Sequence, residues 1–184
     1  MSDEGAADAA VAVARAREAV RRAAETLAAA SARTETLAEY VPGRRILGVP
    51  RSPRMRAIGR VWRLGVLLLD TDGRLYSTGR VVRAERVARR GVTAESVAEH
   101  RALRAAAVRG GIPEGASVVF DAVPLDLAAV ARAADSDPLV LMADRDGGPV
   151  VGVRWNPAAA DAALPLEPYL AERVDLLAHP PQGA

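Results

Sequence analysis

The chain has 184 residues, of which half are hydrophobic, 25 are basic and 23 are acidic, and it contains no cysteine. This length suits one domain with an appendage, and the absence of cysteine excludes disulfides, thiolate metal sites and cysteine nucleophiles. No apolar run approaches the ~20 residues that span a bilayer, and the first residues are small and acidic rather than cationic. We therefore expect a cytoplasmic protein that does not enter a membrane.

The basic residues are all arginine and are unevenly distributed along the chain. Residues 44–109 hold sixteen arginines and five acidic residues, a net charge of +11, whereas residues 1–43 carry −2 and residues 110–184 carry −7. The basic middle is either neutralised by the acidic C-terminal part or faces an anionic partner. The second interpretation makes six arginines candidate anion- or partner-binding residues: Arg44, Arg45, Arg51, Arg54, Arg56 and Arg60.

Residues 8–39 are rich in Ala, Arg, Glu and Leu and lack Gly and Pro, so they predict one long N-terminal helix within residues 1–41. Apolar residues recur in a heptad pattern with small residues three positions on. This pattern defines a helix packing seam that includes Val13, Val20, Leu27 and Leu37. The seam could pack against a helix of the same domain or against a second copy, which would make the protein a homo-oligomer.

Residues 42–60 are rich in Arg, Pro and Gly and predict an irregular linker. The apolar run Val61–Leu69 predicts a strand that is buried on both faces. Asp70–Gly73 then supplies turn residues, because Asp side chains accept hydrogen bonds from nearby backbone amides and Gly tolerates positive φ. The chain returns at Arg74, so this region predicts a β-hairpin.

The region after residue 79 predicts alternating strands and helices. A helix with Thr93 as its N-cap ends at Arg109, where Gly110-Gly111 predicts a C-cap. The later expected elements are a strand over 117–122, a short helix over 125–134, a second hairpin turning at 144–148 and a C-terminal helix over 166–178.

Together these elements predict an α+β fold for residues 61–179, followed by a disordered tail over residues 180–184. We expect an antiparallel sheet of two hairpins plus an additional strand, covered by helices, with the long Ala-rich helix at the N-terminus. Trp62, Tyr76 and Trp155 all lie on predicted strands, and we expect them to share one aromatic core cluster.

The polar motifs indicate structure rather than chemistry. The two Asp-x-Asp-Gly turns lack the twelve-residue ligand spacing and terminal Glu of a calcium loop. His100 and the adjacent Glu99 point about 100° apart on a helix, so their proximity in sequence does not make a hydrogen-bonded pair. We therefore expect no metal site and no cofactor.

Four stretches resemble a family of short uncharacterised proteins from GC-rich bacteria, some of which carry the name glutaminase: Val61–Leu69, Gly73–Gly79, Arg109–Gly111 and Pro165–Arg173. The resemblance implies an amidohydrolase. The chain, however, has neither the lysine nor the cysteine on which the known serine, threonine and cysteine glutaminase mechanisms depend. Ser77, Ser96 and Ser117 could in principle act with His100, but none lies in a Gly-x-Ser-x-Gly elbow.

The sequence as a whole favours a non-catalytic interaction or accessory protein with a basic surface for an acidic or phosphate-bearing partner. Two alternatives remain open. One is the glutaminase activity that the resemblance implies, and the other is a nucleic-acid-binding protein, because the arginine-rich segment lies near Tyr40 and Trp62.

Overall fold

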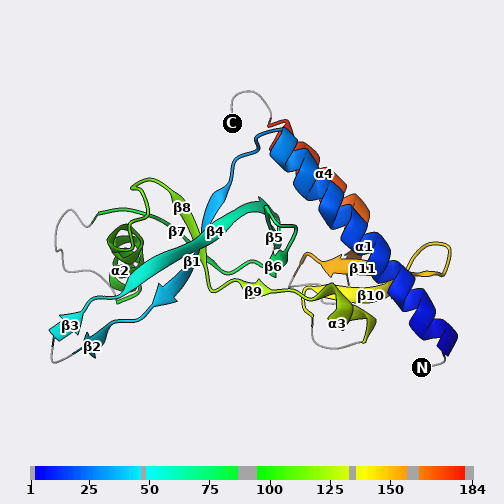
Figure 1. Ribbon diagram of the computed structural model, residues 1–184, viewed down its shortest axis with the longest axis horizontal. Coiled ribbons are helices and arrows are strands. Elements are labelled where there is room, and N and C mark those ends of the chain that lie inside the picture. The colour runs from blue at the N-terminus through cyan, green and yellow to red at the C-terminus, as the bar shows by residue number, and fades with distance from the viewer. Residues whose placement is uncertain (1–2, 47–48, 87–94, 133–135, 157–161, 181–184) are drawn as a thin grey trace. The chain divides into compact units, whose positions relative to one another are not determined.

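The computed structural model describes residues 3–46, 49–86, 95–132, 136–156 and 162–180 (Figure 1). These residues form four helices and twelve strands, which confirms the predicted α+β class. The chain divides into two units, each built from separate stretches of sequence. Unit 1 comprises Met1–Arg33, Trp62–Ser77 and Val123–Ala184, and unit 2 comprises Thr34–Val61 and Thr78–Ala122.

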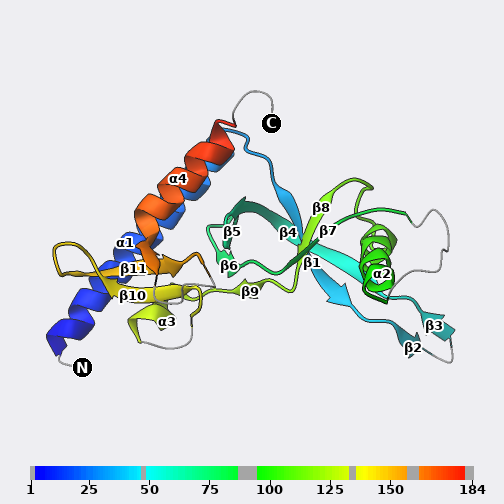
Figure 2. The ribbon, with the colours of Figure 1, turned by 180° about the vertical axis from the view of Figure 1, so that it is seen from behind.

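Unit 1 is organised around α1 (Asp3–Ala29), which lies beside α4 (Leu166–Ala178), as Figures 1 and 2 show. The predicted helix continues too far, because α1 ends at Ala29 and the stretch assigned to its end forms β1 (Glu35–Val41) in unit 2. The backbone amides of Ser31 and Ala32 bond to the carbonyls of Ala28 and Leu27, and Ser31 has a φ of 50°. These bonds form a Schellman motif, which usually places Gly at the left-handed position, and here a serine occupies it.

The predicted packing seam divides between the two units. Val13, Val20 and Leu27 are buried in the hydrophobic core of unit 1, which also contains Leu166 and Leu170 of α4. Leu37 lies on β1 and is therefore not part of the helix seam. Of the two arrangements that the sequence left open, packing within the same domain is the one that the structure shows for these three residues.

Both predicted hairpins are present in unit 1. The first pairs β5 (Leu67–Asp70) with β6 (Leu75–Ser77), and the second pairs β10 (Leu139–Ala143) with β11 (Pro149–Arg154). The expectation that the hairpins share one sheet is wrong. β9 (Val123–Pro124) pairs with β6, whereas β12 (Ala163–Pro165) pairs with β11 in a separate three-stranded sheet. The short helix α3 (Leu127–Ala131) precedes that sheet.

The apolar run Val61–Leu69 is not one strand. β4 (Arg54–Leu64) ends at Leu64, and Gly65, with a φ of 65°, turns the chain into β5. The sequence pattern did not predict this turn, because the residues on both sides of Gly65 are hydrophobic and pack in the core of unit 1.

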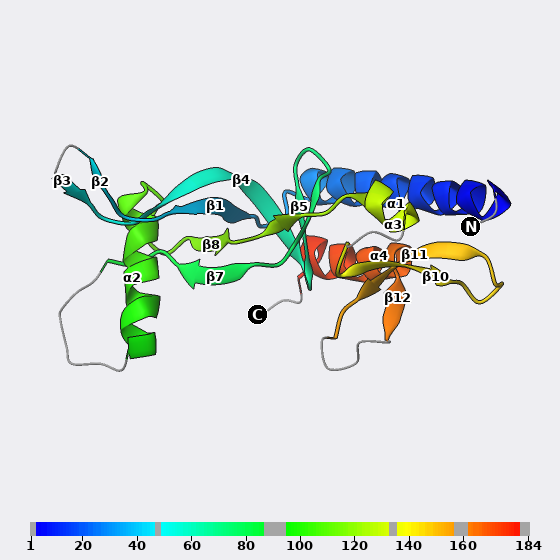
Figure 3. The same ribbon diagram turned by 90° about the horizontal axis from the view of Figure 1, so that it is seen from below.

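Unit 2 contains a mixed β-sheet with the strand order β7 (Arg80–Arg83), β8 (Ser117–Phe120), β1 and β4, seen side by side in Figure 3. The pairing of β1 with β8 is parallel and the other pairings in this unit are antiparallel, which corrects the expectation of an antiparallel sheet. Residues of α2 (Glu95–Arg109) pack with Met55, Val118 and Phe120 in the core of this unit. Thr93, the predicted N-cap of this helix, lies outside the described residues.

Residues 42–60 are not an irregular linker. β2 (Arg44–Ile46) and β3 (Val49–Arg51) form a two-stranded ribbon, and β4 begins at Arg54. The helix-breaking residues fall mostly between these strands, and Pro50 is tolerated because a two-stranded ribbon has open edges. Proline and glycine therefore mark strand ends here.

The prediction that Trp62, Tyr76 and Trp155 share one aromatic core cluster is wrong: Tyr76 is half-buried, bonds to Asp70 and is not a member of the core cluster that holds Trp62. Trp62 is buried in unit 1, and its indole Nε1 donates a hydrogen bond to the Ala32 carbonyl, whereas Trp155 is 44% exposed after the end of β11. Residues 181–184 of the predicted tail lie outside the described residues. No helix in the described part of the chain has the length and apolar character to cross a bilayer.

Candidate anion-binding site

The division of the chain into units redistributes the charge that the sequence showed. The stretches of unit 2 carry fourteen arginines and seven acidic residues, a net charge of +7, and those of unit 1 carry eleven arginines and sixteen acidic residues, a net charge of −5. Ion pairs within unit 2 account for part of its arginines: Arg56–Glu39, Arg80–Glu99, Arg86–Glu114 and Arg104–Glu85. Unit 2 remains basic after this internal pairing.

Two of the six predicted anion-binding arginines are engaged within unit 2. Arg56 pairs with Glu39 on the neighbouring strand β1, and Arg60 donates from Nε to the Thr34 hydroxyl at 2.7 Å. These contacts hold both side chains against β1. We do not include them in the site.

Three of the remaining predicted residues gather around one pocket in unit 2. Arg44, Arg51 and Arg54 line it together with Ser52 and with Arg109, and Val41 and Pro42 complete its wall. Its volume is about 280 Å³. We call this hollow the arginine pocket. None of the ion pairs found among the described residues involves its four arginines.

The ribbon places two of these arginines by strand register. Arg44 lies directly opposite Arg51 in the antiparallel pairing of β2 with β3, so their side chains leave the same face of the ribbon. Arg45 is paired with Pro50 and therefore belongs to the opposite face. This alternation explains why Arg44 lines the arginine pocket and Arg45, its neighbour in sequence, does not.

Arg109 completes the pocket from a distant part of the sequence. It is the last residue of α2, and its Nε donates a hydrogen bond to the Pro53 carbonyl at 2.8 Å. A Cβ on the next residue, Gly110, would overlap the backbone carbonyl of Met55 on β4. The missing side chain of Gly110 therefore allows the end of α2 to approach β4, and this approach brings Arg109 to the ribbon.

Arg109 was predicted as a helix end and was not among the six arginines predicted to bind an anion. The pair Gly110-Gly111 predicted a helix cap, and Gly111 does adopt a φ of 86°. Gly110 has a different role, close contact with the backbone of Met55, and Met55 lies 55 residues earlier in the chain. A helix cap needs one glycine, so the second glycine of the pair was the sequence signal that could have indicated a close backbone contact at this helix end.

The arrangement is suited to binding an oxyanion. Arginine remains charged at any physiological pH, and its planar guanidinium donates in pairs to carboxylate or phosphate oxygens. Like charges that face each other across a strand pair destabilise the pair. Arg44 opposite Arg51, with Arg54 and Arg109 nearby, therefore forms a cluster whose repulsion an anion would relieve.

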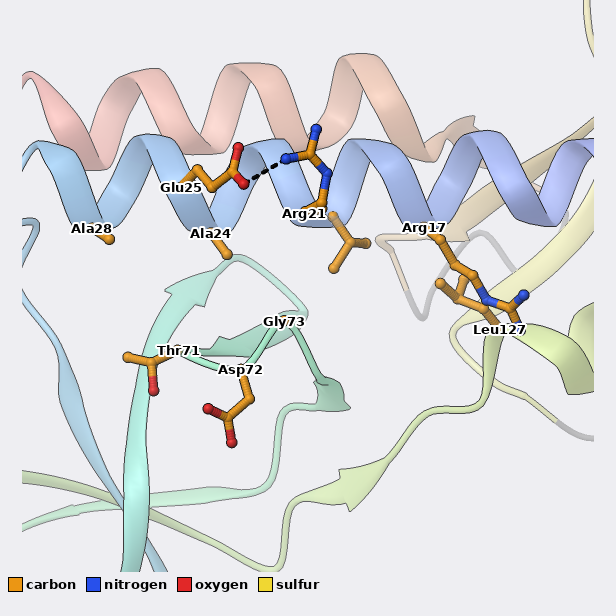
Figure 4. A pocket seen from close by; sticks show the side chains of 10 residues that line it. Arg17, Arg21, Ala24, Glu25, Ala28, Thr71, Asp72, Gly73 and Leu127 are labelled. Carbon is orange, nitrogen blue, oxygen red and sulfur yellow. Dashed lines mark hydrogen bonds and ion pairs between the residues drawn. The ribbon is translucent and has the colours of Figure 1, made fainter.

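A second hollow, of about 350 Å³, lies in unit 1 between α1 and the turn from β5 to β6 (Figure 4). Arg21 on its rim is already bound to Glu18 and Glu25, and the hydrogen bonds to these carboxylates raise the pKa of Arg21. The carboxylate of Asp72 points away from α1 in Figure 4 and lies 3.3 Å from Arg74 Nη1. The charges here are largely satisfied locally, so this hollow is the weaker candidate.

The carboxylates of the hairpin turns serve the fold. Asp70 Oδ1 accepts hydrogen bonds from the backbone amides of Asp72 and Arg74, and Oδ2 accepts one from the Tyr76 hydroxyl at 3.0 Å. The pKa of Tyr76 is raised, mainly by burial and in second place by this hydrogen bond to Asp70. Among the described residues, no three or more His, Asp or Glu side chains gather into a group that could hold a metal ion.

His100 lies exposed on α2. The hydrogen bonds found among the described residues do not join it to a serine or a carboxylate. The described part of the chain thus does not assemble a nucleophile and base around the internal histidine.

Comparison of the chain with protein-family models, with curated proteins and with solved structures gives no match. The arginine pocket is therefore the feature of the chain that bears on its function.

Proposed function

We propose that this chain is a non-catalytic interaction protein whose unit 2 binds an acidic or phosphate-bearing partner in the cytoplasm. The single observation that carries the proposal is the arginine pocket, in which Arg44, Arg51, Arg54 and Arg109 meet without an acidic residue in its lining. Nucleic acid is the alternative anionic partner, since the net charge of +7 on unit 2 would favour it through phosphate contacts.

Physical support for the proposal comes from the charge of the residues that line the arginine pocket. Four guanidinium groups that line one hollow repel one another, and charge-assisted hydrogen bonds to an oxyanion are roughly twice as strong as neutral ones. The arginines elsewhere in unit 2 that pair with glutamates show that the fold can satisfy guanidinium groups internally. An anionic partner would satisfy the four in the pocket.

The test is binding of the full-length protein to long-chain polyphosphate, polyglutamate and a mixed oligonucleotide over a series of salt concentrations. We expect at least one polyanion to bind with an affinity that falls steeply with salt. Replacing Arg44 and Arg51 together by Glu should abolish this binding. The control is Arg45→Glu, a charge reversal on the other face of the same ribbon that makes half the charge change of the double variant.

Retention of binding by the Arg44→Glu/Arg51→Glu protein, or equal loss in the Arg45→Glu control, would contradict the proposal. The first result would show that the polyanion binds elsewhere on the protein. The second would show that the loss of binding follows from the change in net charge and not from the position of the arginines. Circular dichroism of each variant checks that the replacements leave the fold intact.

A further inference from the structure

We infer that the arginine pocket is a diphosphate site, which means that it recognises two adjoining phosphoryl groups of a small phosphorylated ligand. This inference rests on the proposed function and narrows it to one ligand chemistry. Four features of unit 2 support it: the number of charges in the pocket, the placement of its polar groups, its size, and the position of the aromatic side chains.

The charge count favours a polyvalent oxyanion. Four guanidinium groups line the pocket, and its lining contains no carboxylate to offset them. A single carboxylate supplies one negative charge and two oxygens, whereas a phosphate monoester supplies roughly −1.5 to −2 and three acceptor oxygens. Two joined phosphoryl groups would match four cations far better than the isolated carboxylates of an acidic peptide.

The polar groups around the pocket suit the same chemistry. Arg44 and Arg51 face each other across the ribbon, and Arg54, two residues after Ser52, begins β4, the next strand along the chain. Arg109 approaches from the end of α2, where its Nε is fixed by the Pro53 carbonyl. Because this bond uses only Nε, the terminal guanidinium nitrogens can still donate to a ligand.

The size of the pocket favours a small group. Its volume of about 280 Å³ lies at the lower limit of small-ligand pockets, which start at roughly 300 Å³. A compact anion would fill it.

The aromatic residues of unit 2 argue against a nucleic-acid groove. Proteins that hold single strands stack the bases on exposed aromatic rings. The sequence of unit 2 contains two aromatic residues, Tyr40 and Phe120. Phe120 is buried, Tyr40 is half-buried, and their ring centroids lie 6.4 Å apart in a tilted packing contact. Neither ring is an exposed platform for a base, and the exposed imidazole of His100 on α2 is not part of the lining of the arginine pocket.

A diphosphate group could come from inorganic pyrophosphate or from a nucleoside diphosphate. The experiment is isothermal titration of the full-length protein with pyrophosphate, orthophosphate, ADP and GDP, together with a polyglutamate peptide and an oligothymidylate, at one low salt concentration. We expect pyrophosphate to bind at least about tenfold more tightly than orthophosphate, because it engages more guanidinium groups. A nucleotide that binds more tightly than pyrophosphate would support the same site and identify its source as a nucleotide.

Variants locate the site. Arg54→Ala and, separately, Arg51→Ala should each weaken pyrophosphate binding by roughly tenfold or more, since each removes charge-assisted hydrogen bonds. Arg45→Ala, on the other face of the ribbon, should change it less than about twofold. All three side chains are exposed, so the variants should fold, and their thermal unfolding is measured alongside.

The outcomes separate the two hypotheses. If polyglutamate or the oligonucleotide binds in a manner that depends on Arg54 and pyrophosphate does not, the proposed function stands and the diphosphate inference is overturned. If none of the anions binds, both are wrong. If pyrophosphate binds but Arg45→Ala weakens it as much as Arg54→Ala does, the pocket is not the site.

Discussion

The hydroxyl of Tyr169 lies where a side chain on Gly65 would begin. It donates a hydrogen bond to the Leu64 carbonyl at 2.9 Å and accepts one from the Val66 amide at 3.0 Å, so it spans the turn between β4 and β5. Tyr169 is buried on α4, more than 100 residues away in sequence. Because Gly65 has no side chain, the Tyr169 hydroxyl has room to bind this turn and so to fix α4 to it.

We predict that Tyr169→Phe lowers the free energy of unfolding by about 1–3 kcal/mol, because the Leu64 carbonyl and the Val66 amide lose a partner in a largely buried place. The measurement is urea unfolding followed by circular dichroism. Tyr40→Phe is the matched control, since no hydrogen bond from the Tyr40 hydroxyl is found among the described residues. A loss of stability as large in the control would argue against the role of the hydroxyl.

Gly65→Ala should destabilise the protein more than Gly73→Ala. Both glycines have positive φ, 65° and 78°, so an alanine at either position is strained by about 1 kcal/mol or more. Only at Gly65 would the new Cβ also collide with Tyr169, because nothing lies within 4 Å of a Cβ at Gly73. Equal melting temperatures for the two variants would show that the tyrosine moves aside freely.

The sequence predicted elements well where the signal was local. The turn at Asp70–Gly73 carries its own hydrogen-bond acceptor and its own glycine, and α4 was predicted with its observed bounds. The end of α1 was missed, because the Schellman motif uses Ser31 instead of Gly and the following residues are held as β1 by strands distant in sequence. The secondary structure of such a segment depends on which distant strands it pairs with, and amino-acid composition does not show that pairing.

The candidate site was predicted in part for the same reason. Arg44, Arg51 and Arg54 belong to a segment whose excess of arginine is visible in composition. The sequence could not separate them from Arg45, because that distinction depends on the β2–β3 register, nor add Arg109, because that depends on the contact between α2 and β4.

Tyr76 should make stability depend on alkaline pH. Burial and the hydrogen bond to Asp70 raise its pKa in the folded protein above the value of about 10 for an unfolded chain. The fold therefore favours the neutral phenol, so this contribution is fully present below about pH 10 and is lost as pH rises through the folded pKa. We expect the free energy of unfolding of the wild type to fall more steeply above about pH 10 than that of Tyr76→Phe. Parallel pH profiles for the two proteins would contradict this assignment.

The glutaminase activity that the resemblance implies can be tested directly. We expect no release of ammonia from glutamine above the buffer rate, because the chain lacks Lys and Cys and His100 is exposed on α2. The assay compares the wild type with His100→Ala at equal concentration. A clear rate in the wild type that disappears in the variant would favour the hydrolase over the interaction protein.

Gly110→Ala should weaken anion binding although residue 110 carries no charge. The new Cβ would overlap the Met55 carbonyl, so the end of α2 would have to move away from β4 and carry Arg109 from its bond with Pro53. We expect a loss of about 1–3 kcal/mol in unfolding free energy, as for other overpacked sites, together with weaker binding of pyrophosphate.

Gly111→Ala is the control that separates these two effects. Its φ of 86° would strain an alanine, but nothing lies within 4 Å of a Cβ there, so the spacing between α2 and β4 should be kept. We expect Gly111→Ala to lose stability and to keep its affinity for pyrophosphate. If the two variants lose affinity equally, Arg109 is not positioned by Gly110, because general weakening of the helix end would then account for both results.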